Sequence, residues 1–296
     1  MNSLLTFAVA VALTGDIAPV RSRDTTSAAA ETQTVRAYNW GRWEVRETAN
    51  FRIFSLPGHD GAHRLPEVCE ALRKDLQGTW FGKGTSEWTP KCDIMVQPNT
   101  ADYRRILGPA SAGSSGCTSL DLEGGRVIKR RIDLRGDAED WLTAALPHEL
   151  THVVVADRFS KRQLPRWADE GMAILAEPEF KQNRRAQELE KAIDRNLLFT
   201  GGELVTTREY PAPQRRDAFY GQSASLVGFL IERDSPEKFL QFVELAMDSS
   251  YDKALAEVYG ITSTTQLDSM WKPRLRIREQ TPVLLAERLT RIISTP

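Results

Sequence analysis

The chain is poor in the residues and segments that define several large classes of protein. Among its 296 residues are only three cysteines and four histidines, and the cysteines lie too far apart to form a cysteine-based zinc motif. The 39 basic and 40 acidic side chains leave a formal net charge of −1, so no strong field attracts nucleic acid or anionic lipid. No apolar run is long enough to span a bilayer. We therefore expect neither a nucleic-acid partner nor a stable membrane span in the mature chain.

The N-terminus is typical of a processing segment. Leu4 to Leu13 is an apolar run of ten residues, which is too short for a transmembrane helix but suits the core of a signal peptide. We expect residues 1–18 to be a signal peptide, residues 19–35 to be a linker, and the protein to be periplasmic or secreted. The alternative is an uncleaved N-terminus that tethers the protein to the membrane, because no lysine or arginine precedes the apolar run.

The three cysteines are compatible with export. Cys69 falls on a predicted helix and Cys92 just before a predicted strand, so these two could pair in an oxidising compartment. Cys117 would then be free. The sequence alone leaves the pairing open.

Two of the four histidines occur in residues 147–152, which read Pro-His-Glu-Leu-Thr-His. His148 and His152 are four residues apart, so on a helix both imidazoles project from one face. This spacing lets two ring nitrogens bind one Zn²⁺, while Glu149 lies beside the metal rather than on it. A carboxylate placed there can take a proton from water as that water attacks a carbonyl. The motif therefore predicts metal-assisted hydrolysis with Glu149 as the general base.

Apolar residues recur at helical spacing on both sides of the motif, which predicts a buried amphipathic helix. They are Leu142, Ala145, Leu146, Leu150, Val153 and Val154. Two histidines and a glutamate on a buried helix are costly without a partner. A bound metal accounts for them better than the alternative, in which both histidines only make hydrogen bonds in the core.

A catalytic zinc site usually has three protein ligands, so a third must come from elsewhere. Pro165 suits the first turn of a new helix, and that helix would carry Glu170. The intervening loop is long enough for the second helix to return to His152. We assign Glu170 as the third ligand. Asp169 and Glu177 are the alternatives for this role.

These residues resemble a known group, the gluzincin clan of zinc metallopeptidases. The resemblance is carried by residues 148–152, His-Glu-Leu-Thr-His, and by residues 167–173, Trp-Ala-Asp-Glu-Gly-Met-Ala. It is closest to the small bacterial peptidase MA-like proteins, which share the Trp-x-x-Glu-Gly-x-Ala element and a later Tyr-x-Gln-Ser helix. The resemblance covers residues 137–275. It implies a zincin-like fold, one zinc ion per chain and a peptide or protein substrate.

The sequence departs from this clan at positions that bear on mechanism. Thermolysin-like members place an aspartate four residues after the ligand glutamate to orient a zinc histidine, and here that position is Ile174. They also use a later histidine to stabilise the oxyanion, and no histidine follows His152. Aminopeptidase-like members use a tyrosine from a downstream helix, which makes Tyr220 our candidate oxyanion donor. The alternative is that Tyr220 only packs. The Gly-x-Met-x-Asn element of aminopeptidases is missing, so we expect an endopeptidase.

The expected activity is therefore zinc-dependent hydrolysis of peptide bonds, as in metalloendopeptidases. His148, His152 and Glu170 would hold the metal, Glu149 would act as general base, and Tyr220 would stabilise the oxyanion. The alternative is a non-catalytic, zinc-stabilised domain of the same fold that binds a protein partner. Glu149 separates the two, because a purely structural zinc site does not need it.

The pattern of elements predicts an α+β protein. We expect a mixed lobe with a small sheet at 36–136, a helical lobe at 137–296 and an active-site cleft between them. In the first lobe the pattern predicts a hairpin at 43–56, a helix at 65–80, a strand at 92–97, and a hairpin formed by 118–122 and 126–134. In the second lobe Pro147 should kink or restart the metal helix, Gly260 should end a helix, and helices should begin at Ser235-Pro236 and Thr281-Pro282.

Overall fold

The computed structural model describes residues 35–59, 61–84, 86–276 and 283–294. The predicted signal peptide, nearly all of the predicted linker and the helix start predicted at Thr281-Pro282 lie outside these residues.

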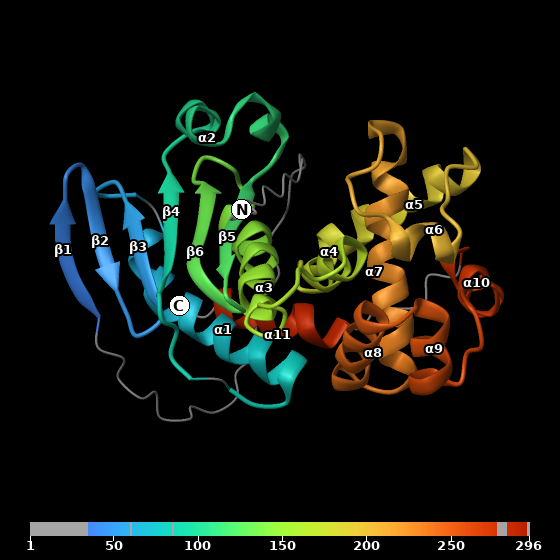
Figure 1. Ribbon diagram of the computed structural model, residues 1–296. Helices are drawn as coiled ribbons and strands as arrows, with labels where there is room; N and C mark the ends of the chain where they lie inside the picture. The colour runs from blue at the N-terminus through green and yellow to red at the C-terminus, as the bar shows by residue number, and fades with distance from the viewer. Residues whose placement is uncertain (1–34, 60, 85, 277–282, 295–296) are drawn as a thin grey trace.

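The strands are β1 (Arg36–Trp40), β2 (Trp43–Glu47), β3 (Phe51–Ser55), β4 (Cys92–Gln97), β5 (Gly116–Glu123) and β6 (Arg126–Arg135). The helices are α1 (Leu65–Phe81), α2 (Thr100–Leu107), α3 (Leu146–Ala156), α4 (Arg166–Leu175), α5 (Glu179–Asp194), α6 (Gly201–Thr206), α7 (Arg216–Arg233), α8 (Pro236–Asp248), α9 (Tyr251–Tyr259), α10 (Thr264–Trp271) and α11 (Val283–Ser294). The α+β prediction is confirmed (Figure 1).

The strands form one mixed sheet of six, in the order β1-β2-β3-β4-β6-β5. The pairs β3–β4 and β4–β6 are parallel and the others are antiparallel. The hairpins predicted at 43–56 and 118–134 are confirmed, as are the helix at 65–80 and the strand at 92–97. The strand β1 and the helix α2 were not predicted. The sheet ends at β5, which is an edge strand within the described part of the chain and the strand nearest α3.

Alternation along the strands gives the sheet two different faces. Ile94 and Val96 on β4 belong to the main hydrophobic core, which α1 and α3 cover, whereas Met95 joins a small separate cluster on the other face. The main core extends without a break from Phe51 on β3 to residues of α11. It therefore includes side chains from both predicted lobes.

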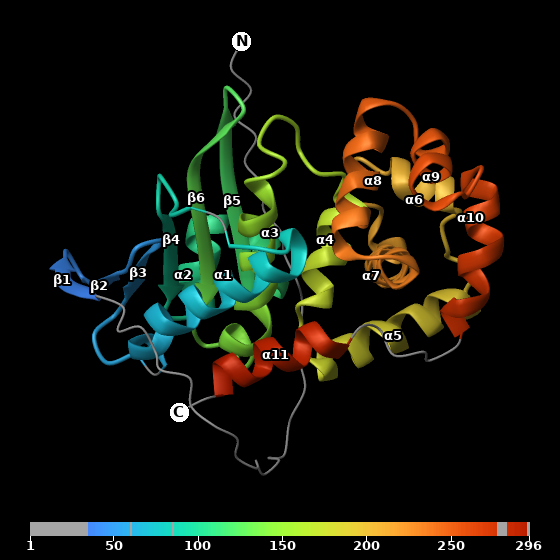
Figure 2. The same ribbon diagram turned by 90° about the horizontal axis from the view of Figure 1, so that it is seen from below.

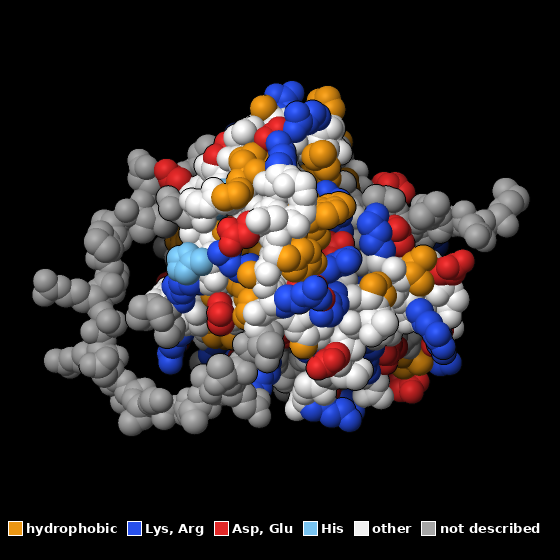
Figure 3. Space-filling view, turned by 90° about the vertical axis from the view of Figure 1, so that its left-hand side faces the viewer, with side chains coloured by type: hydrophobic (Ala, Val, Ile, Leu, Met, Phe, Trp, Pro, Cys, Tyr) orange, Lys and Arg blue, Asp and Glu red, His pale blue; other side chains and the backbone are white. Residues whose placement is uncertain are grey.

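Figure 3 views the molecule from the β1 side and shows hydrophobic side chains exposed among lysine and arginine. Trp40 on β1 is 63% exposed, and its ring packs edge-on against Phe54 at 5.8 Å between centroids. Arg42 lies over the ring of Trp43. The guanidinium of Arg42 thus covers part of the apolar surface of this edge.

The helical part is built around α7, against which α4 and α5 pack (Figure 1). Gly171 lets α4 approach α7 closely, because a β-carbon there would lie 2.6 Å from the backbone oxygen of Ser223. The predicted helix boundaries at Ser235 and Gly260 are confirmed. Ser235 caps α8 by accepting a hydrogen bond from the Lys238 amide, and Gly260 ends α9 in the left-handed region.

The last helix connects the two parts of the molecule. α11 packs on α1 of the sheet part and on α4 and α5 of the helical part (Figure 2). Arg288 on α11 pairs with Asp75 on α1 at 2.9 Å.

In the described part of the chain, no helix combines the length and the apolar character that a membrane span requires. Cys69, Cys92 and Cys117 are all buried and present as free thiols.

Candidate metal centre

The helix α3 carries both histidines of the motif. A π-helical turn, Trp141–Ala145, precedes it, and Pro147 sits in its first turn, where the missing N–H breaks no hydrogen bond. The expected kink or restart at Pro147 corresponds to this change from a π-helical to an α-helical turn. Every residue of α3 is buried. His148 and His152 project from one face of this helix, with their ring centroids 5.1 Å apart.

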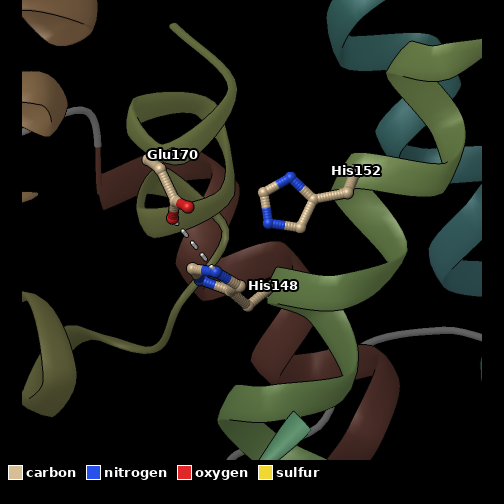
Figure 4. Close-up of side chains that lie close together, drawn as sticks. All are labelled: His148, His152 and Glu170. Carbon is tan, nitrogen blue, oxygen red and sulfur yellow. Dashed lines mark ion pairs between the residues drawn. The ribbon is translucent and has the colours of Figure 1, made fainter. Parts of the chain in front are cut away.

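Glu170 reaches the two histidines from α4, which packs against α3. Figure 4 shows its carboxylate directed towards the imidazoles. One potential ligand atom from each of the three residues can be chosen so that all lie within 4.8 Å of one another, and all three residues are buried. Glu170 Oε2 lies 3.7 Å from His148 Nε2. The structure thus brings together the three residues predicted as ligands.

Each of these three side chains has a buried polar atom without a hydrogen-bond partner among the described residues. Among these atoms are His148 Nε2, His152 Nε2 and Glu170 Oε2. Leaving such atoms unsatisfied is costly, so three of them at one point indicate a missing partner. Two imidazole nitrogens and one carboxylate oxygen are a donor set found in catalytic zinc sites. The residues present therefore fit a zinc ion.

The two residues weighed as alternative ligands lie behind the histidines. Asp169 Oδ1 is 2.7 Å from Nδ1 of His152, and Glu177 Oε1 is 2.8 Å from Nδ1 of His148. A carboxylate on the outer nitrogen of a metal-binding histidine fixes the tautomer and the orientation of the ring. Asp169 and Glu177 thus stand where carboxylates that orient metal-binding histidines would stand, a position that Ile174 cannot fill.

Glu177 is itself held in a buried charged network. Burial alone would raise the pKa of this carboxyl, but Arg185 and His148 outweigh that effect and lower it. Arg185 Nη2 lies 3.5 Å from Glu177 Oε1, and Lys181, which pairs with Asp140, adds a further positive charge nearby. The ionised Glu177 favours a proton on Nδ1 of His148, which leaves Nε2 free to accept a metal.

Tyr210 contacts Glu170 from behind, as Asp169 and Glu177 contact the two histidines. The sequence did not predict it as a site residue. Its hydroxyl donates a hydrogen bond of 2.7 Å to Glu170 Oε1, and the other oxygen, Oε2, has no hydrogen-bond partner among the described residues. Burial, and then the nearby Glu170, raise the pKa of Tyr210 above its usual value, which keeps the hydroxyl protonated as a donor. Tyr210 lies between α6 and α7 in an irregular segment. Because such segments have no hydrophobic periodicity, no sequence signal distinguishes it from other tyrosines.

The charge balance of the cluster also favours a cation. Burial by itself would lower the pKa of His152, but Asp169, Glu170 and Glu149 outweigh it and raise that pKa to about 10. In the absence of a metal, a proton on His152 would compensate part of this carboxylate charge. A divalent cation would compensate more of it and would satisfy the unpartnered atoms as well.

The side chain of Glu149 projects from α3 against the edge strand β5. Thr118 Oγ1 is 2.7 Å from its Oε2 and 3.0 Å from its backbone oxygen, so the threonine hydroxyl can donate to either. Gly116 makes room for the side chain, because a β-carbon at Gly116 would lie 2.6 Å from Glu149 Cγ. Burial raises the pKa of Glu149, although His148 and His152 oppose the effect. The carboxyl is therefore fixed beside the cluster by β5.

Tyr220 is close to the cluster and nearly buried. Its ring lies 6.4 Å from that of Tyr210, and the guanidinium of Arg185 lies over it at 5.1 Å from the centroid. Burial, and then Glu170, raise the pKa of the Tyr220 hydroxyl, so it is protonated at neutral pH. Tyr220 thus has the protonation state that an oxyanion donor requires.

The comparison with known protein families agrees with this geometry. A family model of the Peptidase MA superfamily matches residues 128–276, half of the chain, and the matched part includes α3, α4 and α7. The chain belongs to the Peptidase MA superfamily. Peptidases of this superfamily are typically metal-dependent, and the cluster of His148, His152 and Glu170 supplies a candidate metal site. No protein of curated function matches the chain.

Proposed function

We propose that the protein is a zinc-dependent endopeptidase whose metal ligands are His148, His152 and Glu170. The observation that carries this proposal is the set of three unpartnered, buried atoms that face one another on α3 and α4. Membership of the Peptidase MA superfamily supports a peptide or protein as the substrate.

Both the metal and the residues around it would contribute to peptide hydrolysis. When bound, zinc lowers the pKa of a water molecule to about 7 and polarises the scissile carbonyl. Glu149 accepts a proton from the attacking water while the water oxygen forms a bond to the carbonyl carbon. Glu149 then passes that proton to the nitrogen of the leaving amine as the carbon–nitrogen bond breaks. Its contacts with Thr118 and its fit against Gly116 support this role, because they hold the carboxyl in one position.

Two tyrosines complete the proposed machinery. Tyr220 donates a hydrogen bond to the carbonyl oxygen as negative charge develops on it. Tyr210 instead acts through Glu170, whose carboxylate it orients, and is a positioning residue. The centroids of the two rings lie 6.4 Å apart.

The proposal includes export, with residues 1–18 as a signal peptide that directs the protein to the periplasm or the medium. The apolar run from Leu4 to Leu13 supports this location.

An endopeptidase rather than an aminopeptidase is supported by the missing Gly-x-Met-x-Asn element. Near the cluster there is also a hollow of about 830 Å³, which Tyr210 helps to line and which has room for several residues of a substrate.

Metal analysis combined with chelation tests the proposal. The purified protein should contain about one zinc per chain and should hydrolyse peptides from a mixed library. Removal of zinc by a chelator should abolish hydrolysis, and one equivalent of zinc should restore it. A protein that binds zinc but cleaves no peptide in any library would instead be the non-catalytic, protein-binding domain. A protein that binds no zinc would exclude both functions.

A further inference from the structure

The hollow of about 830 Å³ lies one side chain away from the candidate metal centre. That side chain is Tyr210, which lines the hollow and whose hydroxyl donates to Oε1 of Glu170 at 2.7 Å. Gln163 and Leu164 line this hollow and also a second, smaller one that reaches His152. The two hollows therefore adjoin, and a peptide that passes His152 can continue into the larger space.

Arg166 lines this space and lies one helical turn before Glu170 on α4. Residues four apart share a face of a helix, so Arg166 and Glu170 lie on the same side of α4. Tyr210 contacts both of them. The guanidinium of Arg166 lies over its ring at 4.0 Å from the centroid, while its hydroxyl contacts Glu170. Arg166 is thus held in place one tyrosine away from the metal cluster.

The guanidinium of Arg166 retains unused hydrogen-bond donors. Its Nε donates to the backbone oxygen of Arg208 at 3.1 Å, but no carboxylate of the described residues pairs with Nη1 or Nη2. By contrast, Arg158 in the loop before α4 pairs with Glu244 on α8 at 2.6 Å. The two terminal nitrogens of a guanidinium present parallel donors, a geometry that matches the two oxygens of a carboxylate.

The charge of the hollow also favours an anion. Its charged lining residues are Arg166, Arg208 and Glu209, so the described part of the wall has a net positive charge. Arg208 and Glu209 are exposed, whereas Arg166 is half-buried, and an ion pair at Arg166 is therefore less screened by solvent. A hydrogen bond between charged groups there contributes more than one between neutral groups.

We propose that Arg166 binds a carboxylate of the substrate, so that the protein prefers peptides with an acidic group a few residues from the scissile bond on the His152 side. The proposal rests on the peptidase function proposed above and gives that function a charge preference. Two sources can supply the group, an aspartate or glutamate side chain and the C-terminus of the peptide. Both present the same planar pair of oxygens to the guanidinium.

A purely structural role for Arg166 predicts a different result. If its cation–π contact only held the ring of Tyr210, loss of Arg166 would disturb Glu170, lower zinc affinity and slow the cleavage of all peptides equally. Carboxylate binding instead predicts a loss that is larger for peptides with an acidic group. The ratio of kcat/KM for two peptides that differ only in that group separates the two roles.

The test uses the full zinc-loaded chain and a peptide that the wild type cleaves, with each position in turn replaced by Glu or by Gln. At one position, Glu should give a kcat/KM at least ~10-fold higher than Gln, mainly through a lower KM. In Arg166→Gln this ratio should fall to about 1, and in Arg166→Glu the Glu peptide should become the poorer substrate. Arg104→Gln, the same change at an exposed arginine of α2, should leave the ratio unchanged.

A second set of peptides distinguishes the two sources of the carboxylate. The cleaved peptide is shortened so that its C-terminus falls at the preferred position, and it is made with a free or an amidated terminus. Faster cleavage of the free form, lost in Arg166→Gln, would assign the terminal carboxylate to Arg166. Equal cleavage of the two forms, with the Glu preference kept in longer peptides, would assign an acidic side chain.

Thermal melting and chelator competition check the folding and the zinc affinity of each variant. Arg166→Lys keeps the charge but loses the paired donors, so it should lower the Glu-to-Gln ratio by a smaller factor. This variant keeps the test decisive if Arg166→Gln does not fold, because an unchanged ratio in Arg166→Lys would contradict recognition by the guanidinium.

The outcomes separate this proposal from the function on which it rests. Equal cleavage of Glu and Gln peptides at every position, with no preference for a free C-terminus, would overturn the carboxylate site and leave the peptidase function intact. An equal loss for all peptides in Arg166→Gln would overturn it as well.

If no peptide is cleaved, the peptidase function fails, and binding decides the role of Arg166. Alanine-based peptides that contain Glu or Gln are then titrated against the zinc-loaded protein. Tighter binding of the Glu peptide that Arg166→Gln removes would support the carboxylate site, and equal binding of the two peptides would overturn it.

Discussion

The hydroxyl of Tyr210 lies 2.7 Å from Oε1 of Glu170 and holds that carboxylate with its second oxygen towards His148. Asp169 and Glu177 contact the outer nitrogens of the two histidines in the same way. Each candidate ligand therefore has one atom directed inward and one atom fixed from behind. This arrangement predicts different effects for substitutions in the inner and outer positions.

Substitution of an inner ligand should weaken zinc binding far more than substitution of an outer partner. Glu170→Ala should lower zinc affinity by several orders of magnitude. Asp169→Asn and Glu177→Gln should each lower it by ~10–100-fold, because they only orient the histidines. Competition with a chromogenic chelator measures all three affinities. If Glu170→Ala kept full affinity while Asp169→Asn lost it, Glu170 could not be the third ligand.

Loss of the Tyr210 hydroxyl should affect the metal site without affecting the fold. Tyr210→Phe leaves the ring in place but frees Oε1 of Glu170, so zinc affinity should fall by ~10-fold or more. Chelator competition and thermal melting are the measurements. Tyr38→Phe is the matched control, since it removes a hydroxyl from β1 far from the site and should leave zinc affinity unchanged. Equal zinc affinity in both variants would show that Tyr210 does not position the ligand.

A methyl group at Gly116 should displace the general base. The added β-carbon of Gly116→Ala would overlap Glu149 Cγ, and even a 1 Å displacement of a catalytic group can cost ~10²-fold in rate. Turnover should therefore fall by at least ~10-fold while zinc content stays the same. Gly78→Ala is the control, because a β-carbon on Gly78 in α1 meets nothing within 4 Å. Undiminished turnover in Gly116→Ala would mean that β5 does not fix the carboxyl.

Tyr220 should contribute to the transition state rather than to binding. Tyr220→Phe should lower kcat by ~10–10³-fold with little change in KM or zinc content, because an oxyanion donor acts mainly on developing charge. Steady-state kinetics on one cleaved peptide measures both constants. An unchanged kcat would make Tyr220 a packing residue and leave oxyanion stabilisation to the metal.

The sequence predicted the inner part of the site because helix geometry determines it. Residues four apart on one helix must share a face, so the spacing of His148 and His152 was enough to pair them. Glu170 followed from the need for a third ligand and from a helix start at Pro165. The outer partners were harder to assign, because Asp169 and Glu177 have the same carboxylate chemistry as a ligand. Only the position of each relative to Nδ1 distinguishes the two roles.

Elements with weak periodicity were the ones that the sequence did not predict. Tyr210 lies in an irregular segment, where the path of the chain depends on tertiary contacts. The strand β1 is short and largely exposed, so it lacks the alternation by which a half-buried strand is recognised. The helix α2 is eight residues long and buries only Tyr103, too few apolar residues to form a stripe. The hairpins and the long helices have clear hydrophobic patterns and were predicted correctly.

The most direct test of the account compares turnover of the wild type with that of Glu149→Gln at equal zinc content. This change keeps the size of the side chain and all three candidate ligands but removes the basic carboxylate. We predict at least a ~10²-fold loss of peptide hydrolysis with zinc stoichiometry and melting temperature preserved. Glu139→Gln, the same change at an exposed position before α3, should retain full turnover. Equal turnover of Glu149→Gln and the wild type would contradict the proposed mechanism.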